Sequence, residues 1–142
     1  MTVKNPGAIS EIQAFIEGWK GEAEPMRDCF VSFFKELSAF ADTTLTFIAR
    51  PGVSYSIRPR HIQQKDREMF AIVDVIDDDP QDRWLSVCFY EDMITDPEGR
   101  GELIPGGLGG SDGYCFDLYD DDAAGIQYVL ERITEAAAAA AS

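Results

Sequence analysis

The sequence predicts an α+β domain in which helices pack mainly on one face of an antiparallel sheet. Apolar residues recur at helical spacing in two segments near the start of the chain and in one near its end. Between them lie about five short segments rich in β-branched and aromatic residues, which are typical of strands. No helical pattern separates these segments, so consecutive strands should pair antiparallel. We expect residues 1–142 to form a single domain.

The two N-terminal helices are predicted from their apolar stripes. The first covers residues 6–19, with Pro6 at its first position. Gly18 and Gly21 are expected to end it. The second begins at Pro25, and its wide stripe indicates a well-buried helix. That stripe comprises Met26, Cys29, Phe30, Phe33, Leu37 and Phe40.

A β-hairpin is predicted next. Residues 43–49 have the composition of a strand, and 53–58 form a second strand. Between them, Pro51 and Gly52 occupy the two central positions of a type II turn. Pro59 is expected to end the second strand, because proline cannot donate a backbone hydrogen bond.

Two nearly unbroken apolar runs, 69–76 and 83–90, predict the central strands of the sheet. The residues between them, "DDDPQD", have the composition of a turn. We expect a long loop over 91–113 and a fifth strand over 114–119.

The last helix should follow Asp120, Asp121 and Asp122, one of which is expected to cap it. Its inward face comprises Ile126, Val129, Leu130 and Ile133. The alanine-rich tail, 136–142, continues the helical propensity with nothing to bury, so we expect it to fray.

Charge and composition narrow the classes of partner. Twelve basic residues face 26 acidic ones, giving a formal net charge of -14. This charge opposes binding to nucleic acid and to anionic membranes. No apolar run approaches the roughly 20 residues of a membrane span, and 1–10 lack the pattern of a secretory signal. We therefore expect a cytoplasmic protein.

The number and spacing of the cysteines predict their chemical state. Cys29, Cys88 and Cys115 are odd in number, far apart and without a C-x-x-C pair. We expect free thiols, with at least two of them buried, rather than disulfides or a zinc site. The sequence indicates no metal and no cofactor.

Three stretches resemble the YdhG-like group of small bacterial domains. They are "SYSIR" with the preceding helix, "MFAIVDVI…RWLSVCFY", and "YCFDLYDDDAAGIQYVLERITEA", which together span roughly 22–136. The resemblance implies an α+β fold and assigns no catalytic residue. The segment "PEGRGELIPGGLGGSDG" has no counterpart in that pattern.

The glycine-rich segment, residues 102–113, lacks the features of a phosphate-binding loop. No lysine or arginine occurs between Glu102 and Tyr119. A G-x-G-x-x-G pattern can start at Gly107, but its last position is Asp112. The segment also leads into a predicted strand rather than a helix. We expect a flexible connection or a mobile lid.

A basic segment, residues 50–67, carries the candidate binding site. It holds five of the twelve basic residues, the only histidine and a single acid. Alternation along the second strand should place Val53, Tyr55 and Ile57 toward the core. The opposite face would then present hydroxyl and guanidinium groups suited to a carboxylate or phosphate. The candidate residues are Ser54, Ser56, Arg58, Arg60, His61 and Arg67. The alternative is a charged edge hairpin, or arginines that pair with the chain's own acids.

No catalytic constellation is evident. Turn and cap roles account for the acids at 77–82 and 120–122, which lack a calcium-loop pattern. The leading hypothesis is a non-catalytic binding or protein-interaction module that recognises a small anion or an acidic protein. One alternative is a small enzyme of unknown reaction with the glycine-rich segment as its lid. Another is a structural homodimer formed through a sheet face or edge.

Overall fold

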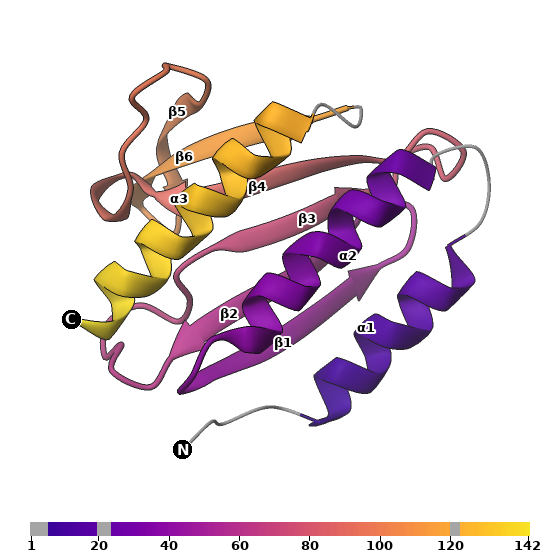
Figure 1. Cartoon of the computed structure of the whole chain (residues 1–142), viewed down its shortest axis with the longest axis horizontal. Helices are drawn as coiled ribbons and strands as arrows, with labels where there is room; N and C mark the ends of the chain where they lie inside the picture. Colours follow the sequence, from indigo (N-terminus) through magenta and orange to yellow (C-terminus); the bar gives the residue numbers. More distant parts are fainter. Residues whose placement is uncertain (1–5, 20–23, 120–122) are drawn as a thin grey trace.

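The computed structural model describes residues 6–19, 24–119 and 123–142, and every structural statement below concerns these ranges. The α+β class is confirmed, with three helices packed on one face of an antiparallel sheet (Figure 1). The elements are α1 (Pro6–Gly18), α2 (Glu24–Ala39), β1 (Thr43–Arg50), β2 (Ser54–His61), β3 (Ile72–Ile76), β4 (Trp84–Tyr90), a 3-10 helix η1 (Glu91–Met93), β5 (Glu102–Leu108), β6 (Ser111–Leu118) and α3 (Ala123–Ala141).

The described sheet has six strands in the order β1-β2-β3-β4-β6-β5, one more than the sequence predicts. Every neighbouring pair is antiparallel. The strands β1 and β5 form the two edges. The strand β6 lies between β4 and β5, so β4 and β6 are neighbours in the sheet although they are not consecutive in the sequence.

The glycine-rich segment is a β-hairpin, which corrects the expectation of a long loop over 91–113. Its β5 and β6 strands are joined by Gly109 and Gly110, whose φ angles of 59° and 94° suit a two-residue hairpin turn. Leu108 is buried against Ile72 and Tyr90, so the hairpin end is anchored to the sheet. Propensity fails here because glycine and proline are depleted in strands, whereas backbone pairing with β6 determines the conformation.

The first hairpin forms as predicted, but β2 is longer. The amide of Val53 donates to the carbonyl of Arg50, and Gly52 has the positive φ, 82°, that its turn position requires. Pro59 lies inside β2 and does not end it. Its carbonyl accepts from the amide of Phe70, which lies two residues before the start of β3. The missing N–H of Pro59 faces that same side, so the β1–β2 ladder loses no hydrogen bond.

The core lies between the helices and the inward face of the sheet. The stripe of α2 is buried as predicted, with Phe30, Phe33 and Leu37 fully enclosed. From the sheet, Ile57 of β2 and Val87 of β4 meet this layer. Side chains that alternate with these core residues point to the opposite face of the sheet, called the outer face below. No described helix covers this face (Figure 1).

The C-terminal tail is helical to Ala141, and the expectation that it has nothing to bury is wrong. Ala136 and Ala140 are buried because they continue the inward stripe of Val129 and Ile133 at helical spacing. Small side chains at these positions allow α3 to approach its neighbours closely. The predicted cap at 120–122 and the predicted role of Gly21 lie outside the described residues.

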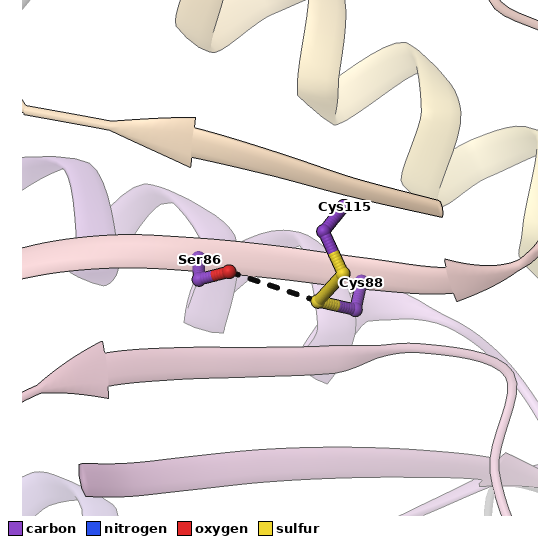
Figure 2. The surroundings of a disulfide bond; sticks show 3 residues. All are labelled: Ser86, Cys88 and Cys115. Carbon is purple, nitrogen blue, oxygen red and sulfur yellow. Dashed lines mark hydrogen bonds between the residues drawn. A yellow bond between two sulfur atoms is a disulfide. The ribbon is translucent and has the colours of Figure 1, made fainter. Parts of the chain in front are cut away.

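Two of the cysteines form a disulfide, which corrects the prediction of free thiols. Cys88 on β4 is bonded to Cys115 on β6 (Figure 2). The prediction fails because it rests on the number and sequence spacing of the cysteines, which do not show the register that pairs Cys88 with Cys115. Cys29 is free and buried as expected, and burial raises the pKa of its thiol to about 12.

Candidate functional site

A groove of about 550 Å³ lies on the outer face where β1, β2 and the connection after β2 meet. It brings together two guanidinium groups, two threonine hydroxyls, one carboxylate and three apolar side chains. The lining residues are Thr44, Thr46, Ile48, Arg58, Arg60, Ile62, Glu68 and Met69. Alternation along β1 and β2 points the strand residues of this set away from the helices.

Arg58 contributes a guanidinium whose Nε atom is buried without a hydrogen-bond partner in the described chain. Arg58 is paired in register with Thr46 of β1, which also lines the groove. A buried donor without an acceptor costs free energy, and more so when the group is charged. The wall of the groove therefore contains a charged donor that no described residue satisfies.

The arginines of the first hairpin differ from those elsewhere in the described structure. Arg50 donates to the Ser54 hydroxyl at 3.0 Å and Arg60 to the Gln64 carbonyl at 3.1 Å, so both have neutral partners. Each arginine outside this hairpin has a carboxylate oxygen within 4.0 Å. The pairs are Arg27–Asp28, Arg67–Asp92, Arg83–Asp77, Arg100–Glu98 and Arg132–Glu135.

Asp74 is the acid that acts electrostatically on these arginines. It lies opposite Ser56 in the β2–β3 pair and accepts a hydrogen bond from the Ser56 hydroxyl. Burial raises the pKa of Asp74, and the Ser56 hydrogen bond and the charges of Arg58 and Arg50 oppose that rise. Asp74 thus interacts with both guanidinium groups through space while its hydrogen bond goes to serine.

Ser54 and Ser56 lie on the same side of β2 as Arg58, as alternation predicts, but both are buried rather than available. Ser54 accepts from Arg50, and Ser56 donates to Asp74. Small side chains between larger cross-strand neighbours lose access to solvent even on a sheet face without helices. These hydroxyls therefore organise the sheet next to the groove and do not line it.

His61 and Arg67 are not part of the groove. The Nδ1 atom of His61 accepts from the Gln63 amide at 3.1 Å, so the ring belongs to the turn after β2. Arg67 makes a bidentate pair with Asp92 at 2.7 and 3.0 Å, and its guanidinium lies 4.0 Å from the centre of the Tyr90 ring. The mutual hydrogen bonds raise the pKa of Arg67 and lower that of Asp92.

Of the residues that line the groove, the sequence predicts only Arg58 and Arg60 as site residues. Thr44, Thr46 and Ile48 are contributed by β1, where alternation gives a usable signal. Glu68 and Met69 come from the irregular connection before β3, and only the tertiary structure places them. Their presence makes the groove amphipathic rather than uniformly basic.

The first acid cluster has a structural role. Asp77 is buried, forms an ion pair with Arg83 at 2.7 Å and accepts from the Gly52 amide at 2.9 Å. Arg83 also lies over the rings of Phe15 and Trp19. These contacts join the first hairpin to α1. Across the part of the chain that the structure describes, no group of three or more His, Cys, Asp or Glu side chains is placed to hold a metal.

Comparison with family models, with curated proteins and with solved structures gives no match. Over residues 6–19, 24–119 and 123–142, no helix is long and apolar enough to cross a membrane.

Proposed function

We propose that this domain is a non-catalytic binding module whose outer-face groove takes a carboxylate or phosphate group. The group would belong to a small molecule or to an acidic protein. The observation that carries the proposal is the buried, unpartnered Nε atom of Arg58 beside Arg60. The chain has 26 acids for 12 basic residues. Among the described residues, Arg60 nevertheless hydrogen-bonds to a backbone carbonyl and the Nε of Arg58 has no partner.

The chemistry of the groove suits such a ligand. A guanidinium presents several donors in one plane and can hold a carboxylate or phosphate by two hydrogen bonds. The hydroxyls of Thr44 and Thr46 supply further hydrogen-bonding groups, and Ile48, Ile62 and Met69 supply an apolar wall. A ligand with one anionic group and an apolar portion would use all three kinds of surface.

Binding by the intact protein tests the proposal. Chemical-shift titrations with inorganic phosphate, citrate and a short polyglutamate peptide should shift the amide signals of β1 and β2. Each lost charge-assisted hydrogen bond is worth about 1.5–3 kcal/mol, so Arg58→Gln should weaken affinity at least about tenfold. Arg60→Gln should act in the same direction.

Lys65→Gln is the matched control. It removes one positive charge from the same connection, but Lys65 is exposed and does not line the groove. The affinity of the Lys65→Gln variant for the three probes should stay close to that of the wild type. Equal weakening by Lys65→Gln and Arg58→Gln would mean that only general electrostatic attraction is measured. Failure of all three probes to bind would leave the arginines with a structural role and refute the proposal.

The lid hypothesis has less support from the geometry. A lid must open and close over a site, whereas Leu108 at the end of β5 is buried against Ile72 and Tyr90. The groove is formed by β1, β2 and the connection after β2, and no residue of the glycine-rich segment lines it. A binding surface is therefore the better interpretation.

A further inference from the structure

The disulfide joins residues that the sheet already holds face to face. Cys88 and Cys115 are paired directly in the β4–β6 register, and their Cα atoms are 4.1 Å apart. Strand pairing continues on both sides of them, from Leu85–Leu118 to Tyr90–Gly113. Backbone hydrogen bonds therefore keep the two sulfur atoms adjacent whether or not they are bonded to each other.

Both cysteines are also partly exposed. Cys88 and Cys115 are half-buried on the outer face, where Cys88 packs against the cluster of Ile72, Tyr90 and Leu108, and no described helix covers that face (Figure 1). Cys29 provides a contrast within the same chain, since it is 3% exposed in the helix-covered core. We therefore expect a thiol reagent to reach this pair more readily than Cys29.

The two sulfur atoms have different surroundings. The Ser86 hydroxyl lies 3.6 Å from the sulfur of Cys88 and can donate to it (Figure 2). Cys115 instead pairs in register with Glu102 of β5, an exposed acid. A donor favours a thiolate and a neighbouring carboxylate disfavours one. The nearest acids to Cys88 on the neighbouring strands, Asp74 and Asp117, lie opposite Ser86 rather than opposite Cys88. Negative charge is therefore better accommodated on Cys88.

We propose that the Cys88–Cys115 pair is a reversible thiol–disulfide exchange site for a dithiol reductant. One thiolate of the reductant attacks the sulfur of Cys115, the disulfide breaks, and Cys88 leaves as a thiolate next to Ser86. The second thiol of the reductant then attacks the mixed disulfide and releases Cys115. Two electrons and two protons pass to the cysteines, and the reductant becomes a disulfide. Oxidation by a disulfide reverses these steps.

Reduction of the native protein tests the exchange itself. The oxidised protein is treated with dithiothreitol without denaturant, alkylated and analysed by mass spectrometry. We expect two modified cysteines, Cys88 and Cys115, with Cys29 unmodified and the amide spectrum still that of a folded protein. Oxidised dithiothreitol should restore the disulfide. A requirement for denaturant, or loss of the folded spectrum on reduction, would show a purely structural disulfide and overturn the proposal.

The assignment of Cys88 as the leaving thiolate is tested with single-cysteine variants. The pH dependence of alkylation should give a lower thiol pKa for Cys88 in Cys115→Ser than for Cys115 in Cys88→Ser. Ser86→Ala should raise the pKa of Cys88, while Ser32→Ala on α2 should leave it unchanged. In wild-type protein, a mixed disulfide trapped with glutathione should map to Cys115. Equal pKa values, or an adduct mainly on Cys88, would overturn this assignment.

Discussion

Asp74 and Arg58 lie on neighbouring strands of the outer face, yet they interact only through space. The carboxylate of Asp74 accepts from Ser56, which is directly opposite it, while the Nε of Arg58 stays unpartnered. Burial of Asp74 favours its protonated form, because a charged group loses solvation there. The positive charge next to the groove is consequently not cancelled by a direct contact.

This arrangement predicts that Asp74→Asn strengthens anion binding. Asparagine keeps the shape and a hydrogen-bond acceptor for Ser56 but removes the negative charge that opposes an incoming anion. We expect severalfold tighter phosphate binding at neutral pH, measured by the same titrations, with no loss of stability. Asp117→Asn is the control, since Asp117 is an exposed outer-face acid on β6. Weaker binding by Asp74→Asn would contradict the electrostatic interpretation.

Asp96 has the opposite environment, in which hydrogen bonds stabilise its charged form. Burial tends to raise its pKa, but the Tyr128 hydroxyl, the amides of Gly101 and Arg100, and the Tyr114 hydroxyl all donate to it. Together these donors lower the pKa of Asp96 to about 2. This carboxylate ties the connection before β5 to β6 and α3.

The lowered pKa predicts a loss of stability in acid. The contribution of Asp96 is complete above its ordinary pKa of 3.8 and disappears as the pH falls through about 2. Urea unfolding between pH 5 and pH 2 measures it. Asp96→Asn should be less stable than the wild type at pH 5, and the difference should shrink toward pH 2. A constant difference across this range would show that the charge of Asp96 does not contribute.

At the scale of elements, the β5–β6 hairpin depends on close backbone approach at its start. A Cβ atom on Gly101 would lie 2.4 Å from Cε2 of Tyr114 and 2.8 Å from Phe116. Gly101→Ala should therefore destabilise the protein by about 1–3 kcal/mol, the usual cost of overpacking, measured by urea unfolding. Gly18→Ala is the control, because a Cβ at Gly18 meets nothing within 4 Å. Equal stability of the two variants would contradict this packing.

The sequence best predicts those elements whose conformation depends on residues close together in the chain. The stripe of α2 and the Pro51-Gly52 turn are of this kind, because burial and backbone angle are encoded in neighbouring residues. The strand β5 is different. All of its residues except Leu108 are exposed, including Leu103 and Ile104, and its conformation comes from pairing with β6. The disulfide was missed because the strand register that pairs Cys88 with Cys115 is not contained in the number and spacing of the cysteines.

In the candidate site, too, local features are predicted from the sequence and features that depend on distant residues are not. Alternation along β2 correctly predicts the side of the sheet on which Arg58 lies, since that depends on local geometry alone. It does not predict that Ser54 and Ser56 are buried, or that Arg67 pairs with Asp92. Burial and ion pairing depend on neighbours that are distant in the sequence, and a charge pattern alone does not identify them.

At the scale of the whole molecule, the net charge repels anions, whereas two arginines in the groove attract them. A formal charge of -14 repels anions over distances comparable with the Debye length, about 10 Å at 0.1 M salt. The guanidinium groups of Arg58 and Arg60 attract an anion only at short range, within the groove. Selectivity should therefore come from contact with the groove rather than from long-range attraction.

This balance predicts two separable responses to salt. Raising sodium chloride from 10 to 150 mM should increase the free energy of unfolding, because screening weakens the self-repulsion of the acids. Phosphate at the same ionic strength should add stability through binding, about 1.4 kcal/mol when its concentration is ten times the Kd. Urea unfolding measures both terms. Arg58→Gln should keep the chloride response and lose the extra effect of phosphate, while Lys65→Gln should keep both. If phosphate stabilises Arg58→Gln as much as the wild type, the anion acts elsewhere and the groove is not its binding site.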